Sequence, residues 1–558
     1  MWVTLLHLAI QAPAAPNDPQ ISITRDTARA LKEARTAVID FEQRRRHYLP
    51  ITSGRSGRCD DHIGRFCYWY DESDSTRPKE PEPLVRHRRQ LLGALTRFAF
   101  AAPTDDWVIG QRVRYLLEAE ESDSAIALAS DCRATQWWCE ALLGLALHAR
   151  QRFEASEAAF DRSLAHQPAS LRCSWTDWAK VLPEQVARRL KDRDCAGTTG
   201  LADSLFWLGQ PLLSRPGNDL RTELYSRRVM AALHAASLSP HLIPWGHDLE
   251  EMMLRYGWPT GWSVADQPPG GLNLPSVVGH DRVPAYPFFP IPGASDGGWR
   301  WELGLERPRA RYAPGYADRF ATASDFQLAK FPRGDSTVLV GAMSPPGDTE
   351  FSEGPFRIAL AASRQLGERA TTAFVGASSV SEPVILRVAG NPALISLEAN
   401  PVNGRAFLRA RTWRPPAPRR DGLIISDLLL FAVAPDLPGT LEAAAARALP
   451  SLRISRQAPV GVYWEASGPG SDSVEVVVTV TPVRRGLFGR IGQRLSIVSR
   501  RKAQSLTWQA ATDSGQVVVG RAFELNLRRQ SPGRYLLGLE ARSRGKRSLT
   551  TRSFQLTP

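Results

Sequence analysis

The stretch WGHDLEEMMLRYGWP, residues 245–259, marks the point at which the chain changes character. Before it, apolar residues recur at three- and four-residue steps, which predicts amphipathic helices. After it, proline and glycine become frequent, and apolar and polar residues then alternate with a period of two, which predicts short strands. The sequence therefore predicts a multidomain protein with an all-α N-terminal half followed by β-sandwich-like C-terminal domains.

Length and composition limit the class of protein. A chain of 558 residues is too long for one hydrophobic core and should form several domains. A hydrophobic content of 43% with 16 Trp and 20 Phe excludes global disorder. We find no apolar run long enough to cross a bilayer, so we expect a protein that does not span the membrane.

The net charge of +13 is concentrated at the C-terminus, since residues 484–558 hold 16 Lys or Arg and 3 Asp or Glu. An anion-binding surface is one interpretation, with acidic envelope polymers or lipid surfaces as partners. The other is a solvated strand face, because only seven of the 70 basic residues are Lys, an arginine bias typical of GC-rich coding. Few aromatics interleave with the arginines, so sequence-specific nucleic-acid binding is not expected. The candidate anion-binding residues are Arg485, Arg490, Arg494, Arg500 and Arg501.

The N-terminus and the cysteines indicate an oxidising compartment. Residues 1–15 combine a short apolar run with Ala12-Pro13-Ala14, which fits a signal peptide, although no Lys or Arg precedes Arg25. All six cysteines lie before residue 200, in the order Cys59, Cys67, Cys132, Cys139, Cys173 and Cys195. We expect sequence neighbours to pair as three disulfides in a periplasmic or secreted protein. A metal site of Cys59, His62 and Cys67 is the alternative, but a structural zinc ion needs four ligands, so no metal or cofactor is expected.

The helical half is expected to have three parts. Residues 22–102 should form N-terminal helices with a disulfide loop, and residues 103–204 a helical repeat. Gly110 and Gly144 are 34 residues apart, the period of tetratricopeptide repeats, and the second unit resembles that family in its small and large helix-packing positions. Such repeats either bind a partner protein or serve only as a scaffold. Residues 205–262 form the third part.

The stretch quoted above resembles the conserved segment of the bacterial GWxTD-domain family, in which W-x-T-D is followed by R-Y-G-x-P. The matching residues are Trp245, Asp248, Arg255, Tyr256, Gly257 and Pro259. The chain departs from that pattern at Pro244, His247 and Glu250. The resemblance implies a secreted or envelope protein with a structural motif of no settled activity. We expect the motif's aromatics to be buried and to join the helical half to the next domain.

Three further segments complete the predicted organisation. Residues 263–320, dense in proline, glycine and aromatics, should form an extended segment packed on a surface. Residues 321–440 should form a β-rich domain, and residues 455–558 a basic β-domain. Within the latter, Pro532-Gly533-Arg534-Tyr535 and the alternating residues after it resemble a late strand of immunoglobulin-like domains.

Motifs for catalysis are weak. The sequence has no phosphate-binding loop, nucleophile elbow or His-Glu-x-x-His motif, and we assign no catalytic residue. We expect a non-enzymatic protein with an interaction or scaffolding role at the cell envelope. One alternative is a hydrolase-like enzyme near residues 245–262, which would need a polar cleft where His247, Asp248 and Glu250 converge. Another is a small-ligand or glycan-binding module that uses the aromatic Pro-rich segment as a trough.

Overall fold

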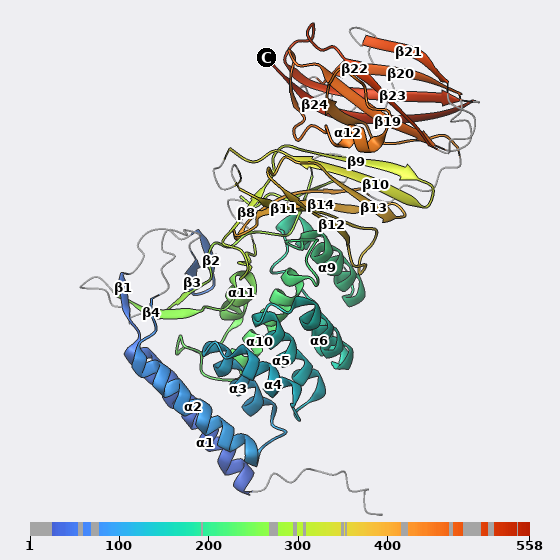
Figure 1. The fold of residues 1–558 in the computed structure, drawn as a ribbon. Helices are drawn as coiled ribbons and strands as arrows, with labels where there is room; N and C mark the ends of the chain where they lie inside the picture. Colours follow the sequence, from blue (N-terminus) through green and yellow to red (C-terminus); the bar gives the residue numbers. More distant parts are fainter. Residues whose placement is uncertain are drawn as a thin grey trace, which may run out of the picture.

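The structure is a computed structural model, shown as a ribbon in Figure 1. It describes residues 25–53, 60–68, 78–190, 193–266, 277–293, 298–304, 309–347, 351, 354–414, 422–467, 473–483, 504–511, 518–543 and 545–558. Within these residues helices dominate as far as Tyr256 and strands dominate from Gly261 onward. This division confirms the predicted helical N-terminal half and β-rich C-terminal half.

Two long helices, α1 (Arg25–Tyr48) and α2 (Glu82–Ala101), lie side by side at the N-terminal end of the described chain (Figure 1). Ala34 and Val38 of α1 face Leu91 and Leu95 of α2 in one apolar cluster. These residues recur at three- and four-residue steps, so each helix buries one face. The pair forms an arm that projects from the remaining helices (Figure 1).

Short strands link this arm to residues far along the chain. They are β1 (Ile51–Ser53), β2 (Asp61–Ile63), β3 (Phe66–Tyr68), β4 (Gly261–Asp266) and β5 (Val277–His280). The first pairs in parallel with β4, which pairs antiparallel with β5, while β2 and β3 form a hairpin. The N-terminal arm is therefore closed onto the segment that follows the quoted stretch.

The 34-residue repeat folds as two helix pairs, α3 (Asp106–Glu118) with α4 (Ser122–Ser130) and α5 (Gln136–Ala149) with α6 (Phe153–His166). Its two glycines lie where helices touch. A Cβ atom on Gly144 would come within 2.8 Å of the Phe160 ring, and one on Gly110 within 2.7 Å of Leu233. The small residues of the repeat therefore permit close helix packing, as the sequence pattern predicts.

The other helices are α7 (Ala169–Trp175), α8 (Glu184–Ala187), α9 (Cys195–Gly209), α10 (Asp219–Ala235) and α11 (His247–Tyr256). Helix α10 occupies the centre of the helical half, because it packs against α3, α5, α6, α9 and α11. Asn218 caps its N-terminus by accepting the Arg221 N–H at 3.0 Å. Because α10 is buried on nearly all sides, it is the central helix on which the surrounding helices pack.

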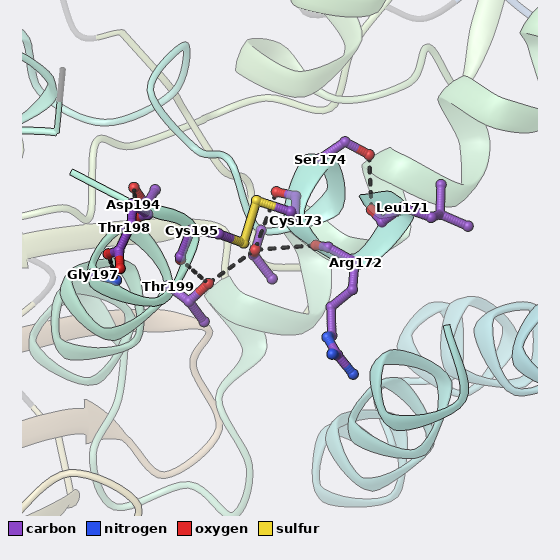
Figure 2. The surroundings of a disulfide bond; sticks show 10 residues. Leu171, Arg172, Cys173, Ser174, Asp194, Cys195, Gly197, Thr198 and Thr199 are labelled. Atoms are coloured by element: carbon purple, nitrogen blue, oxygen red, sulfur yellow. Dashed lines mark hydrogen bonds between the residues drawn. A yellow bond between two sulfur atoms is a disulfide. The ribbon is translucent and has the colours of Figure 1, made fainter. Parts of the chain in front are cut away.

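Disulfides bond Cys132 to Cys139 and Cys173 to Cys195, each with Cα atoms 5.6 Å apart. These two neighbour pairs are as predicted, and they fit an oxidising compartment. The second bond ties α7 to the first residue of α9, where Thr199 donates to the Cys195 carbonyl at 2.9 Å and to Thr176 at 3.0 Å (Figure 2). Cys59 and the side chain of Cys67 lie outside the described residues, so their pairing stays a prediction.

The aromatic Pro-rich segment is packed, as expected, but inside the helical half. Its short strands are β6 (Ile291–Pro292) and β7 (Trp299–Arg300). Phe288, Phe289 and Tyr312 are buried in the same core as residues of α5, α9 and α10. Tyr286 and Tyr312 exchange backbone hydrogen bonds of 2.8 and 3.0 Å, which closes the segment on itself. It forms part of the core of the helical half.

The first β-sandwich has two facing sheets. One has the order β13-β10-β9 and the other β12-β11-β14-β15-β8. The strands are β8 (Arg319–Thr322), β9 (Phe326–Arg333), β10 (Ser336–Met343), β11 (Phe356–Ser363), β12 (Thr371–Ala377), β13 (Val384–Ala389), β14 (Leu394–Pro401) and β15 (Ala406–Trp413). Alternate residues from both sheets, such as Leu339, Leu386, Ile358 and Leu397, meet in one buried cluster. This is the inward-facing pattern of a sandwich core.

The second β-sandwich is built in the same way. Its strands are β16 (Ile424–Ile425), β17 (Leu429–Ala432), β18 (Arg453–Ser455), β19 (Val460–Ser467), β20 (Ser473–Pro482), β21 (Gln504–Ala511), β22 (Val518–Leu525), β23 (Gly533–Ser543) and β24 (Lys546–Thr557). One sheet has β16, β17 and β22 paired with β19, and the other has the order β18-β24-β23-β20-β21. Tyr535 donates to the Ser531 carbonyl at 2.7 Å, a short upstream contact known from immunoglobulin-like domains.

The boundary between the sandwiches differs from the one expected near residue 440. Strands β16 and β17 pair with β19, so the second sandwich already begins at Ile424. Sequence patterning locates strands but not their partners, and this pairing joins residues some thirty positions apart. Helix α12 (Leu441–Ala445) then packs, with Phe431 and Tyr463, against Phe331 and Val340 of the first sandwich. The two sandwiches therefore share an apolar interface.

Candidate functional site

The residues of the quoted stretch hold the β2–β3 hairpin. Helix α11 begins after Gly246, and its Asp248 accepts two N–H groups of the Arg65 guanidinium, at 2.5 Å to Oδ2 and 2.8 Å to Oδ1. Gly64, in the hairpin turn at φ +53°, lies so close that a Cβ atom would come within 2.5 Å of the Asp248 side chain. Arg65 holds the pKa of the Asp248 carboxyl well below its usual range.

The other end of α11 contacts the same hairpin. Tyr256 donates to Asp61 at 2.7 Å, and Arg255 approaches the same carboxylate oxygen at 2.9 Å. The Tyr256 ring also stacks on Tyr68, with ring centroids 3.6 Å apart. Asp248, Arg255 and Tyr256 therefore each contact β2–β3, and the family-like motif acts as a clamp on a hairpin of the N-terminal region.

A buried arginine fixes the end of this clamp. The Arg227 guanidinium, on α10, donates to the carbonyls of Leu254 and Arg255 at 3.0 and 2.9 Å and to that of Arg311 at 2.7 Å. Its charge is balanced by Glu223 at 2.7 Å. Burial acts to raise the pKa of Glu223, but Arg227 and His148 outweigh it and lower that pKa to about 2.

One carboxyl group beside the clamp titrates near neutrality. Burial raises the pKa of Asp281 to about 7, against the lowering effects of a hydrogen bond with Tyr68 and the charges of Arg227 and Arg311. The same burial, with Asp281 as the nearest charge, raises the pKa of Tyr68. A perturbed carboxyl group is a general sign of a functional site, but here its neighbours are the structural residues of the clamp.

The polar groups required by the enzyme hypothesis do not converge. His247 is 96% exposed and lies 3.7 Å from Glu250. Glu250 also pairs with Arg228 at 3.4 Å, while Asp248 is engaged by Arg65. Among the described residues, no group of three His, Cys, Asp or Glu is placed to hold a metal ion. The geometry at 245–262 gives no nucleophile, base and reacting position within mutual reach.

The motif's aromatics are buried to different degrees and contact the helical half. Tyr256 is buried, whereas Trp245 and Trp258 are half-buried against the core of the helical half. Trp245 stacks on His234 of α10 with centroids 5.6 Å apart. We expected these aromatic residues to join the helical half to a β-domain. The contacts described for them are instead to helices and to the β2–β3 hairpin. The aromatic trough expected of a glycan-binding Pro-rich segment is also not open, since Phe288, Phe289 and Tyr312 are core residues.

The contact between the helical half and the first sandwich combines an apolar cluster, in which Leu208 and Leu213 meet Ala361 and Leu394, with a set of buried charges that we call the seam. Glu398 of β14 accepts the Leu213 N–H at 2.7 Å, and Arg409 and Arg411 of β15 donate to carbonyls of the segment that follows α9. The acceptors include Gln210 at 2.6 Å and Pro211 at 2.9 Å. Burial, reinforced by the charge of Arg411, lowers the pKa of Arg409 well below its usual value.

Beside the seam lies an open cavity of about 1000 Å³, which we call the cleft. Residues of α6, α9 and the start of α10 form its helical wall, and β11, β12 and β14 form its sheet wall. The side chains used below are Glu154, Glu157, Asp161, Asp203, Arg221, Arg357, Leu366, Arg369 and Phe374. A cavity of this size between two domains is a common place for a ligand.

The charged groups on the helical wall are mostly paired with one another. Arg221 contacts Asp161 at 2.6 Å and Glu157 at 3.4 Å. Burial raises the pKa of both Glu157 and Asp203. Across the mouth, the exposed Arg369 lies 3.5 Å from Glu154. An exposed pair of this kind is screened by solvent and contributes little to holding the mouth closed.

The sheet wall presents apolar surface. Phe374 of the edge strand β12 is 49% exposed, with the Arg357 guanidinium 4.2 Å from its ring centre. Leu366, at the same mouth, is 44% exposed. Such groups are usually buried in a monomer, and their position on a cavity distinguishes them from scattered surface residues.

Sequence reasoning missed the seam and the cleft. Arg409 and Arg411 alternate with apolar residues in β15, which reads as a solvated strand face. Only the helical segment placed against that face shows that they are buried. The five candidate anion-binding arginines, from Arg485 to Arg501, lie outside the described residues, so that interpretation stays a prediction.

No protein-family model matches the chain, and no curated protein matches it either. Among solved structures, the crystal structure of the chicken CNTN1 FN1-FN3 domains is similar at 11% sequence identity, over 44% of this chain and 68% of that chain, with a TM-score of 0.15. A TM-score this low establishes no common fold. Among the described helices, none is both long and apolar enough to cross a membrane.

Proposed function

We propose that the protein is a non-enzymatic interaction protein of the bacterial cell envelope, periplasmic or secreted, whose protein partner binds in the cleft. The observation that carries this proposal is the cavity of about 1000 Å³ with Phe374 and Leu366 exposed at its mouth. Most of its titratable groups are occupied in ion pairs, which favours binding over proton transfer. The two disulfides support a compartment outside the cytoplasm.

We also propose that the segment from Trp245 to Pro259 is a GWxTD-like motif with a structural role. Support comes from the contacts of Asp248, Arg255 and Tyr256 with the β2–β3 hairpin. Because these three side chains are engaged in intramolecular contacts, they position the hairpin and are not available for chemistry. The helical half then serves as a scaffold that supplies one wall of the cleft.

The partner proposal is tested by site-specific photocrosslinking in cells. A photoreactive phenylalanine analogue replaces Phe374 in the full chain, and the matched control carries it at Leu549, which is also exposed but lies on the second sandwich. We expect one discrete protein adduct from position 374, recovered in the envelope fraction, and none from position 549. The same adduct pattern from both positions, or no adduct from position 374, would contradict the cleft as the binding site.

A further inference from the structure

A second cavity, of about 730 Å³, lies between the two sandwiches and carries an excess of positive charge. Five cationic side chains line it, namely Lys330, Arg414, Arg453, Arg534 and Arg552, against the two carboxylates of Asp325 and Asp427. We call it the cationic cleft. Its walls come from β9, β14 and β15 on one side and from β23 and β24 on the other.

Both carboxylates of this cavity already have donors. Asp325 accepts the Leu452 N–H at 2.8 Å and a hydrogen bond from the Ser451 hydroxyl. Asp427 accepts the Lys330 backbone N–H at 3.1 Å and lies 3.4 Å from Arg414. These carboxylates hold the loops of the two sandwiches together, and they leave a formal excess of three positive charges.

The deepest cation is Arg552. Its guanidinium is buried and donates to the carbonyls of Leu328 and Leu428 at 3.0 and 2.9 Å. Within the described part of the chain, no carboxylate forms an ion pair with it. Burial lowers the pKa of Arg552, so its charge is held at a cost that a bound anion would offset.

The other four cations lie around this buried group. Lys330 is half-buried, and its ammonium donates to the Pro392 carbonyl. Burial lowers its pKa to about 8, against the charge of Asp427, so the amine is mostly protonated at neutral pH. Arg414, Arg453 and Arg534 are exposed. Charges gathered in a concave site reinforce one another's field and favour an anion there.

The uncharged lining indicates what kind of anion fits. Hydroxyl and amide side chains are contributed by Ser324, Thr412, Ser553, Gln555 and Thr557. The aromatic residues Tyr535 and Phe554 stack on each other with centroids 5.6 Å apart and are buried, so they are not free to stack on bases. A cavity of about 730 Å³ exceeds the size of a single phosphate, and many hydroxyl partners with several guanidinium groups suit a sugar chain.

We infer that the cationic cleft binds an acidic oligosaccharide, one that carries carboxylate or sulfate groups on its rings. This inference is independent of the partner proposed for the first cleft, because the two cavities share no lining residue. Guanidinium groups of Arg414, Arg453 and Arg534 would contact the acidic groups, and the hydroxyl side chains would contact the ring hydroxyls.

The test is calorimetric titration of the full chain with tetragalacturonate, a heparin-derived tetrasaccharide and neutral maltotetraose. We expect an acidic tetrasaccharide to bind and neutral maltotetraose not to bind. Tighter binding of tetragalacturonate would indicate recognition of carboxylate groups, and tighter binding of the heparin-derived tetrasaccharide would indicate recognition of sulfate groups. In the triple variant Arg414→Gln, Arg453→Gln and Arg534→Gln, the affinity should fall at least tenfold. The three side chains are exposed, so the variant should keep its thermal unfolding midpoint.

The matched control changes the same amount of charge on the helical half, through Arg29→Gln, Arg86→Gln and Arg188→Gln, which are all exposed positions in helices or directly after one. It should bind like the wild type. Equal loss of affinity in both triple variants would show a long-range charge effect and overturn the inference. Unchanged binding in the cleft variant, equal binding of maltotetraose, or complete displacement by a single-stranded oligonucleotide would overturn it as well.

Discussion

Gly257 lies at a backbone φ of +99°, and a Cβ atom at this position would come within 3.4 Å of the Arg227 guanidinium. The same guanidinium binds the last carbonyls of α11, so the helix end and the buried charge are placed together. Trp258 and Pro259 then lead the chain towards β4, which receives the N-terminal β1. The glycine therefore lets the chain leave α11 at a positive φ, directly beside the buried charge of Arg227.

Replacing this glycine should destabilise the fold. Gly257→Ala should lower the free energy of unfolding by about 1–2 kcal/mol, because an alanine is strained at positive φ. Chemical denaturation followed by tryptophan fluorescence measures the change. Gly376→Ala is the control, since no atom would lie within 4 Å of its new Cβ. Equal stability of the two variants would contradict the role assigned to Gly257.

Removing the buried guanidinium should cost more. Arg227→Met would leave Glu223 without its main partner and the carbonyls of Leu254 and Arg311 without their guanidinium donor, and such changes typically cost about 3–5 kcal/mol. The variant should also release the β2–β3 hairpin, which hydrogen exchange at residues 61–68 would detect. Arg189→Met serves as the control, because that side chain is exposed. Normal protection of the hairpin in the Arg227 variant would argue against the clamp.

The seam should depend on one carboxylate. Glu398→Gln removes the negative charge that faces Arg411 at 3.5 Å and the Leu213 N–H at 2.7 Å. We expect a loss of about 3–5 kcal/mol and faster proteolysis of the segment between α9 and α10. Glu382→Gln is matched in chemistry, since that carboxylate also accepts backbone N–H groups but is exposed. Similar proteolysis of both variants would be inconsistent with the seam.

The Cys173–Cys195 bond should be the more stabilising of the two disulfides described. It closes a separation of 22 residues, against 7 for Cys132–Cys139, and chain entropy then gives about 3 and about 2 kcal/mol. The paired variants Cys173→Ser with Cys195→Ser, and Cys132→Ser with Cys139→Ser, separate the two contributions. The variant that lacks Cys173–Cys195 should have a lower thermal unfolding midpoint than the variant that lacks Cys132–Cys139. The reverse order of the two midpoints would contradict this prediction.

The stability contributed by two buried carboxyl groups should fall as the pH rises from about 4 to about 7. Burial raises the pKa of Asp219 to about 6 and that of Asp281 to about 7, so both groups bind protons more strongly when folded. Their contribution is fully present below the unfolded value near 4 and is lost as the pH passes the folded values. Glu223, with a pKa lowered to about 2, acts in the opposite sense below this window. The buried His234 and His241, whose pKa values are lowered by burial, act in the opposite sense within it.

The variant Asp281→Asn isolates the upper part of that dependence. It keeps an acceptor for Tyr68 but has no proton to lose, so its free energy of unfolding in urea should fall less between pH 5 and 8 than that of the wild type. The pH dependence that remains in the variant combines Asp219 with His234 and His241. An unchanged slope in the variant would exclude Asp281 as its source.

The sequence predicted elements well where one face is buried and regular. The helix periodicity before Tyr48 and the short apolar run Val384–Leu386 correspond to α1 and β13. Both patterns arise from local burial, which side-chain spacing records directly. The edge strand β12 (Thr371–Ala377) escaped prediction because it has small, partly exposed residues with little alternation.

Tertiary contacts between residues far apart in the sequence could not be predicted from the sequence. Arg227 looked like any helix-surface arginine, and Glu398, Arg409 and Arg411 looked like the solvent side of strands, yet all four are buried. Charges are buried only when a remote segment supplies acceptors, and no local pattern encodes that segment. The same limit applies to both cavities, whose walls come from elements far apart in the sequence.

The pairing of β1 with β4 has a consequence for how the protein is made. Thr52 and Ser263 lie 2.8 Å apart through their hydroxyls, although 211 residues separate them. At a synthesis rate of roughly 5–20 residues per second, about 10–40 s separate the synthesis of β1 from that of its partner strand β4. The interval between the synthesis of Asp61 and that of its hydrogen-bond donor Tyr256 is almost as long. Strand β1 is therefore synthesised early but can pair only after most of the helical half has been made.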